Sequence, residues 1–117
     1  MPITSIAWIA GIFEGEGCLY RRTHPKANWT VQLRMTDEDI VHRFANFFNC
    51  GSPVRIETAP SKQKNKPVFR WICNKKEDVI SVITQMLPYL GDRRAGKVFD
   101  CLEDYDYQWV LNEQRTA

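Results

Sequence analysis

The chain has 117 residues, of which 44% are hydrophobic and 26% charged, and its formal net charge is +2. This length suits one domain that buries a core of its own, although a chain of this size gains stability from oligomerisation. No apolar run is long enough to cross a bilayer and no secretory signal is visible, which argues against membrane and secreted proteins and favours an intracellular globular one.

The modest net charge hides an uneven distribution along the chain. Residues 17–76 contain twelve Lys and Arg against four Asp and Glu, whereas residues 77–117 contain four against eight. A basic middle segment suits a protein that places one surface on a polyanion. The alternative is an ordinary excess of solvated charge.

The four cysteines, Cys18, Cys50, Cys73 and Cys101, are widely spaced and form no CxxC pair. This spacing argues against a zinc site. With no secretory signal, we interpret them as free thiols in a reducing compartment, such as the cytoplasm, an organelle or a phage-infected cell.

In chain order, the first predicted element is a helix over residues 6–17, with apolar residues at helical spacing after a cap at Thr4 or Ser5. A second stripe on this helix consists of small residues: Ala7, Gly11 and Gly15, with Ala10 beside it. Each glycine inside a helix costs about 1 kcal/mol relative to alanine. Because small residues at this spacing let two backbones approach closely, we predict that a second copy of the helix packs here.

The predicted helix ends in Glu14-Gly15-Glu16-Gly17, two carboxylates and two glycines. Acidic residues are disfavoured at a helix C-terminus, where the helix dipole is already negative. A divalent cation would remove this conflict, because hard cations bind carboxylate and carbonyl oxygens. The alternative is a glycine cap followed by two solvated glutamates.

Two strands of a hairpin are predicted next, over residues 18–24 and 29–35. The second alternates apolar and polar residues, with Val31, Leu33 and Met35 on the core side. The opposite face of the hairpin carries Cys18, Tyr20, Arg22, His24, Thr30, Gln32 and Arg34.

A helix capped within residues 36–39 follows and ends at residues 49–51. Short strands are predicted over residues 52–58 and 68–73, separated by a basic loop over residues 59–67. We place Arg70 outward on the last strand. A helix that begins with Asn74 as its cap and stops at Pro88 precedes a last helix from Asp92 and a frayed tail over residues 112–117.

This order, α-ββ-α-ββ-α-α, predicts an α+β fold with a curved four-stranded antiparallel sheet and helices on one face. The other face would expose Tyr20, Arg22, His24, Thr30, Gln32, Arg34, Arg55 and Arg70. Arginine pairs with guanine and glutamine with adenine, so such a face suits the major groove of DNA. The alternative is an ordinary solvated sheet surface.

The segment Ile9-Ala10-Gly11-Ile12-Phe13-Glu14-Gly15-Glu16-Gly17 resembles the motif of the LAGLIDADG homing endonucleases. Glutamate replaces both aspartates of the motif, at Glu14 and Glu16. The order of elements strengthens the likeness, which extends over nearly the whole chain and favours a single domain of this type over residues 1–117.

The resemblance implies a homodimer, because one chain carries one motif, with the two motif helices in contact through Ala7, Ala10, Gly11 and Glu14. It also implies cleavage of double-stranded DNA at a near-palindromic site with Mg²⁺ or another divalent cation. Each helix would deliver one carboxylate to one strand, leaving short 3′ overhangs, in the context of an intron or intein.

Carried over by position, Glu16 is the metal ligand, joined by the carbonyl of Gly15. Asp37 would order water, with a simple helix cap as the alternative. Arg93 would stabilise charge near the scissile phosphate, with Arg94 or a plain surface role as alternatives. Glutamate in place of aspartate moves the carboxylate by about 1.5 Å, and misplacement on that scale costs up to about a hundredfold in rate.

Two other functions stay open at this point. A non-cleaving module of the same fold would act as an intron RNA maturase or a DNA-binding regulator, and an RNA role is not ruled out. An unrelated α+β interaction protein would be a monomer without affinity for nucleic acid. The two histidines show no metal-ligand spacing; we interpret His24 as a DNA contact and His42 as structural or solvent-facing.

Overall fold

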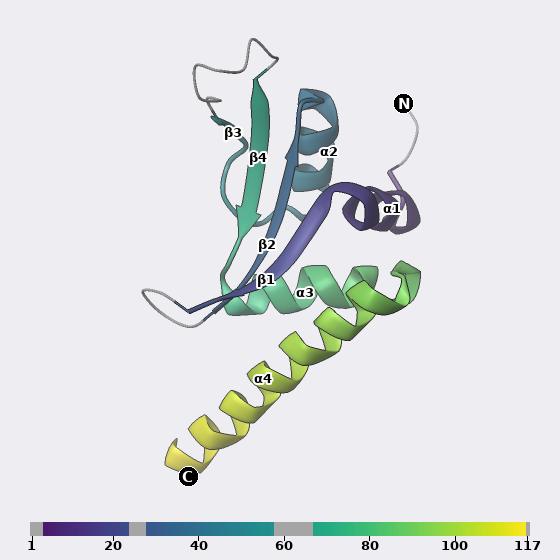
Figure 1. The fold of residues 1–117 in the computed structure, drawn as a ribbon. Coiled ribbons are helices and arrows are strands. Elements are labelled where there is room, and N and C mark those ends of the chain that lie inside the picture. Colours follow the sequence, from purple (N-terminus) through teal and green to yellow (C-terminus); the bar gives the residue numbers. More distant parts are fainter. Residues whose placement is uncertain (1–3, 24–27, 58–66, 117) are drawn as a thin grey trace.

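The computed structural model describes residues 4–23, 28–57 and 67–116, with side chains up to residue 105. Its elements are α1 (Ile6–Glu16), β1 (Gly17–Arg22), β2 (Asn28–Met35), α2 (Glu38–Phe48), β3 (Arg55–Glu57), β4 (Val68–Cys73), α3 (Lys76–Met86), the 3-10 helix η1 (Leu87–Tyr89) and α4 (Asp92–Thr116) (Figure 1). The predicted order is confirmed, with one short 3-10 helix added before α4. His24 and most of the predicted basic loop lie outside the described residues.

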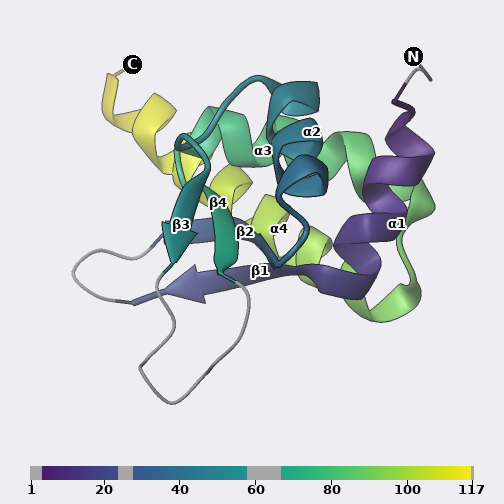
Figure 2. The same ribbon diagram turned by 90° about the horizontal axis from the view of Figure 1, so that it is seen from above.

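The strands form a four-stranded antiparallel sheet in the order β1-β2-β4-β3. The helices cover one face of this sheet and leave the other face open (Figure 2). The register places Tyr20 opposite Thr30, and Arg34 opposite Arg70. The predicted α+β class, the sheet and the one-sided helical layer are therefore confirmed.

The core lies between the sheet and the helices and is centred on aromatic side chains. Phe44 of α2 packs edge-on against Trp71 of β4, with ring centroids 5.3 Å apart, and lies 6.4 Å from Phe13 of α1. Phe13, Phe44 and Trp71 are at most 1% exposed. The alternation predicted for the strands produces this core, because every second side chain of β2 and β4 points toward the helices.

Two glycines are required by this packing. A Cβ atom on Gly17 would lie 2.1 Å from the Phe13 ring, so only glycine lets the chain leave α1 over that ring. Gly51 has a positive φ of 85°, a conformation that side chains disfavour, and its Cβ would lie 2.8 Å from the carbonyl oxygen of Ile72.

The helix starts were predicted with mixed success. Ser5 caps α1 as expected, its hydroxyl accepting a hydrogen bond from the backbone N–H of Trp8 at 3.1 Å. The prediction of Asn74 as the cap of α3 is wrong, because the N-cap is Lys75, which makes no side-chain capping bond. The strand ends at Cys73 as predicted, and α3 begins at Lys76, one residue later than the capping pattern suggested.

The last helix, α4, is fastened to the first hairpin by its middle turns. The Tyr105 hydroxyl accepts a hydrogen bond from the backbone N–H of Trp29 at 3.1 Å, and the indole N–H of Trp29 donates to Asp104 at 3.0 Å. Burial raises the pKa of Tyr105, so this hydroxyl stays protonated well into alkaline conditions. Beyond this point α4 projects away from the body and continues to Thr116, through most of the segment expected to fray (Figure 1). None of the described helices is both long and apolar enough to span a membrane.

Candidate active site

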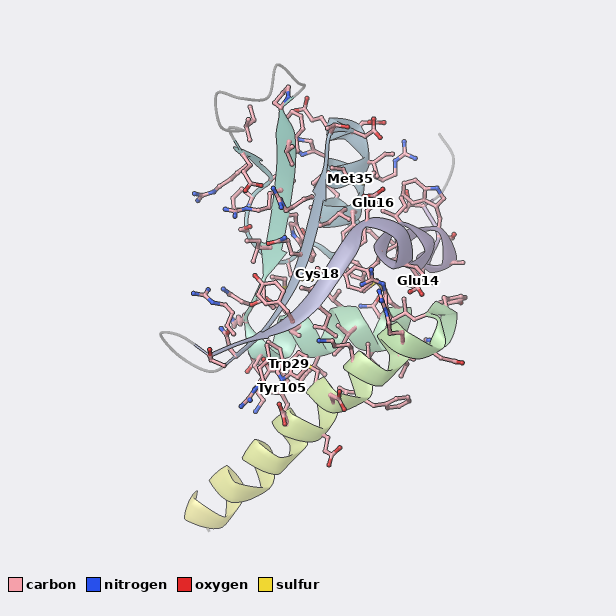
Figure 3. The ribbon with its side chains drawn as sticks, viewed as in Figure 1. Glu14, Glu16, Cys18, Trp29, Met35 and Tyr105 are labelled. Atoms are coloured by element: carbon pink, nitrogen blue, oxygen red, sulfur yellow. The ribbon has the colours of Figure 1, made fainter. Side chains whose placement is uncertain are left out.

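Glu16 and Asp37, which are 21 positions apart in the sequence, line one cleft of about 380 Å³. Glu16 is the last residue of α1, and Asp37 lies in the connection from β2 to α2. The pairing of Gly17 with Leu33 brings these two segments together, because the end of α1 then lies beside the end of β2. Met35 lines the same cleft, and Figure 3 shows it near Glu16.

Both carboxylates of this cleft are exposed, and neither has a hydrogen bond or ion pair to the described part of the chain. Asp37 occupies the N-cap position of α2, yet its side chain makes no capping hydrogen bond. A capping role alone therefore does not account for Asp37. The structure leaves two carboxylates available to a ligand at the same place.

Glu14, the other acidic residue of the motif, is engaged by the protein itself. Its carboxylate accepts a hydrogen bond from the backbone N–H of Gly91 at 3.2 Å and lies 3.4 Å from Nε of Arg94. Arg94 also donates to the Glu14 carbonyl oxygen at 3.1 Å and lies over the Phe13 ring. Glu14 thus joins α1 to the start of α4, and Figure 3 shows it on a different side of the helix end from Glu16.

The predicted basic residue, Arg93, lies in a different cleft. That cleft, of about 340 Å³, is formed by α4, Phe13 and the start of β1, and it also contains Lys97. Arg34, and not Arg93, is the basic residue that lines the cleft of Glu16 and Asp37. Arg93 is thus separate from the cleft of Glu16 and Asp37, and its expected role near the scissile phosphate stays a prediction. Lys97 was missed, although its spacing of one helical turn from Arg93 was a usable signal.

The oxygen donors of the Glu16 cleft fit a hard divalent cation. Glu16 and Asp37 supply two carboxylates, and Gly15 belongs to the last turn of α1, where carbonyl groups lack helical partners. Mg²⁺ is bound through one or two carboxylates with several waters retained, which an open cleft allows.

The open face of the sheet carries a row of arginines in register across three strands. Arg34 of β2 lies opposite Arg70 of β4, which in turn lies opposite Arg55 of β3. Arg34 pairs with Glu57 at 2.7 Å, whereas Arg55 and Arg70 make no ion pair with the described residues. Like charges directly opposite in a sheet are destabilising, so this face is adapted to something other than its own stability.

Several solved structures share this architecture. The homing endonuclease I-CvuI in complex with the I-CreI target superimposes with a TM-score of 0.61 and 19% identity over 83% of this chain and 63% of that chain. The LAGLIDADG meganuclease I-AabMI bound to uncleaved DNA has a TM-score of 0.68 and 13% identity, over 97% of this chain and 39% of that chain. The homing endonuclease I-TnaI has a TM-score of 0.61 and 17% identity, over 95% of this chain and 75% of that chain. The chain has the LAGLIDADG homing endonuclease fold. No protein-family model matches the sequence, and neither does any curated protein.

Within this LAGLIDADG fold, the chain spans 63% of the length of the I-CvuI chain and 39% of the I-AabMI chain. At identities below 25% these likenesses establish the fold and leave the role of each residue to the geometry. The motif itself lies where the sequence placed it, on α1 and its junction with β1.

The small residues of α1 divide into two groups. Ala10 is 0% exposed and packs in the core of its own chain, so its predicted place in a dimer interface is wrong. Ala7, Gly11 and Gly15 are exposed, and a Cβ atom built on either glycine meets nothing within 4 Å. The fold of one chain therefore does not require glycine at positions 11 and 15.

Two further predictions for the sheet face and α2 are settled by burial. Thr30 was expected to contact DNA, but it is only 1% exposed, with its hydroxyl unbonded within the described part of the chain. Its neighbours Tyr20 and Gln32 are half-buried, and Arg22 is exposed. His42 is exposed on α2 and lies 3.4 Å from Glu38, in agreement with a solvent-facing role.

Proposed function

We propose that the chain is a site-specific double-stranded DNA endonuclease of the homing endonuclease type, active as a homodimer of a single domain over residues 1–117. The observation that carries this proposal is the pair of carboxylates, Glu16 and Asp37, that share a cleft and have no hydrogen-bond or ion-pair partner among the described residues. This cleft adjoins the open sheet face through Arg34, which belongs to both.

The arginine row supports DNA as the substrate. A duplex places phosphates and guanine edges within reach of a sheet in the major groove, and both attract arginine. The repulsion between Arg55 and Arg70, which lie opposite each other without an ion pair to the described residues, is relieved when a polyanion lies on them. Arg22 and Gln32 extend the same surface, whereas Thr30 is too deeply buried to take part.

The open glycines of α1 support the homodimer. Gly11 and Gly15 together cost the helix about 2 kcal/mol relative to alanine, and no contact with the described residues requires them. Close approach of a second α1 explains both. A two-fold dimer then presents one Glu16 to each strand and favours a near-palindromic target.

The chemistry follows from the positions of the side chains. Glu16, with the carbonyl of Gly15, would hold Mg²⁺ or another divalent cation, which supplies charge neutralisation and an activated water when bound. Asp37 accepts a hydrogen bond from the attacking water and orients it. Arg34, in the same cleft, stabilises negative charge on the phosphate, and Arg93 contacts the backbone from its own cleft.

The test is a plasmid library with randomised two-fold symmetric targets, incubated with the protein and Mg²⁺ and sequenced at the breaks. Discrete breaks in both strands that vanish in Glu16→Gln and persist in Glu14→Gln would support the proposal. Binding without breaks would favour a non-cleaving regulator, and preferential binding of structured RNA would favour a maturase. Neither binding nor dimerisation would indicate an unrelated interaction protein.

A further inference from the structure

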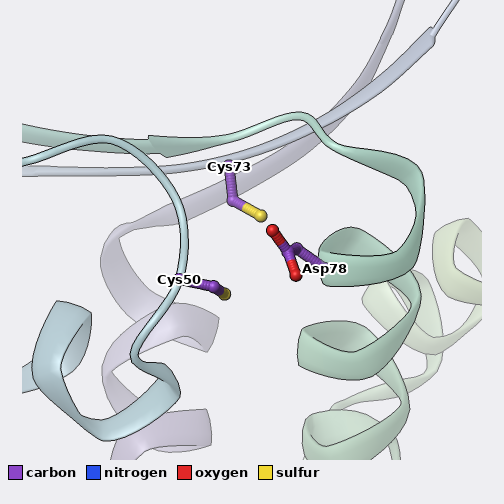
Figure 4. Close-up of side chains that lie close together, drawn as sticks. All are labelled: Cys50, Cys73 and Asp78. Atoms are coloured by element: carbon purple, nitrogen blue, oxygen red, sulfur yellow. The ribbon is translucent and has the colours of Figure 1, made fainter.

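Three side chains that the proposed nuclease site does not use converge at the opposite end of the sheet. Cys50 comes from the segment after α2, Cys73 is the last residue of β4, and Asp78 lies in the first turn of α3. Their two sulfur atoms and one carboxylate oxygen all lie within 4.8 Å of one another. Figure 4 shows the three side chains directed into one gap between these elements.

We propose that Cys50, Cys73 and Asp78 form a structural site for Zn²⁺. Tetrahedral zinc with bonds of about 2.3 Å to sulfur and 2.0–2.2 Å to oxygen places its ligand atoms roughly 3.5–3.8 Å apart. The observed separations of up to 4.8 Å reach this value through small side-chain rotations. Three protein ligands leave a fourth position for water.

The donor set selects the metal. Thiolates are soft ligands that bind zinc and copper(I), whereas Mg²⁺ and Ca²⁺ take oxygen ligands alone. This site and the Glu16 cleft are therefore chemically distinct, one for a thiophilic cation and one for a hard cation.

The charges of the three side chains favour a bound cation. Burial, and then the neighbouring Cys50, raise the pKa of Cys73 to about 12, and burial followed by Asp78 raises the pKa of Cys50, so both thiols lose their protons only when a cation binds. Two thiolates beside a carboxylate need a positive charge between them, and the ion provides it.

The position indicates a structural role. By the rise of a strand, Cys73 lies about 16 Å along β4 from Val68, the residue of this strand that lines the Glu16 cleft. Cys73 also points to the core face, away from the arginines. An ion here ties the segment after α2 to the junction of β4 and α3, and so holds β3 and β4 in place.

Titration of the full, reduced chain with Co²⁺ and Zn²⁺ tests the site. We expect one Co²⁺ per chain with a thiolate-to-cobalt charge-transfer band and the intense visible bands of tetrahedral cobalt, both displaced by Zn²⁺. Cys50→Ser and Asp78→Asn, at half-buried positions that tolerate the change, should each weaken zinc at least about tenfold. Zinc should raise the melting temperature of the unmodified chain and not of Cys50→Ser.

Cys18→Ser is the matched control, because Cys18 is an exposed thiol on the other face of the sheet and should leave zinc binding unchanged. A cobalt spectrum without a thiolate band, or zinc affinity unaltered in both Cys50→Ser and Asp78→Asn, would overturn the proposal. The outcome is independent of DNA cleavage, since the two sites share no residue.

Discussion

Glu14 and Glu16 lie two positions apart in one motif, yet they make different contacts in this fold. Glu14 is held by Gly91 and Arg94 and connects α1 to α4, whereas Glu16 faces a cleft and makes no hydrogen bond or ion pair with the described residues. The difference arises because a helix turns by about 200° over two residues, which directs one carboxylate toward α4 and the other toward the sheet. A carboxylate that its own chain leaves unpaired is available to a ligand.

The largest effect is expected at Glu16. Glu16→Gln removes the charge of the proposed metal ligand and should lower the cleavage rate by about a thousandfold, because metal stabilisation of the transition state is worth several kcal/mol. Single-turnover cleavage of the selected target measures the rate. The free energy of unfolding should not change. A cleavage rate within tenfold of the rate of the unmodified chain would show that Glu16 is not a metal ligand.

A smaller effect on the cleavage rate is expected at Asp37, the second carboxylate of the cleft. Asp37→Ala should reduce the single-turnover rate by about a hundredfold, the lower end of the range for positioned proton-transfer groups. A helix cap would cost about 1 kcal/mol of stability when replaced by alanine. Because Asp37 makes no capping bond, urea denaturation should show a smaller loss. Lost stability with unchanged cleavage would restore the capping interpretation.

Gly17 and Gly11, two glycines of the same motif, should also respond differently to substitution. Gly17→Ala places a methyl group against the Phe13 ring and should destabilise the chain by about 2 kcal/mol. Gly11→Ala meets open space and should stabilise an isolated protomer by up to about 1 kcal/mol while weakening the dimer. Urea denaturation and sedimentation equilibrium report the two quantities. If Gly11→Ala leaves association unchanged, close helix contact at this residue is excluded.

The smallest effect is expected at Glu14. Glu14→Ala removes the bonds to Gly91 and Arg94, which are partly exposed and together worth about 1 kcal/mol after screening by solvent. Denaturation of Glu14→Ala beside Arg94→Ala and the double variant measures their coupling. A coupling energy near zero would show that the contact does not stabilise the joint between α1 and α4.

Contacts between distant segments account for the predictions that failed. Ala10 and Thr30 have the sequence positions of an interface residue and a solvent-facing strand residue, but packing buries both. The sequence did not show that Arg34 lines the cleft of Glu16 and Asp37 while Arg93 lines another, because the path of α4 relative to β1 is not encoded in any short pattern. The spacing of Cys50, Cys73 and Asp78 carries no metal signature, since three separate elements bring them together.

The sequence by itself determined the order of helices and strands, the core-facing residues of β2 and β4, a cap of α1 at Thr4 or Ser5, and the motif with its acidic end. These features are local, because helical and strand periods are set by backbone geometry within a few residues. Only the tertiary structure decided which carboxylate stays unpaired, which arginine joins it and which thiols meet. Those outcomes depend on the pairing of β1 with β2 and on the path of α4, where residues far apart in the chain compete for the same space.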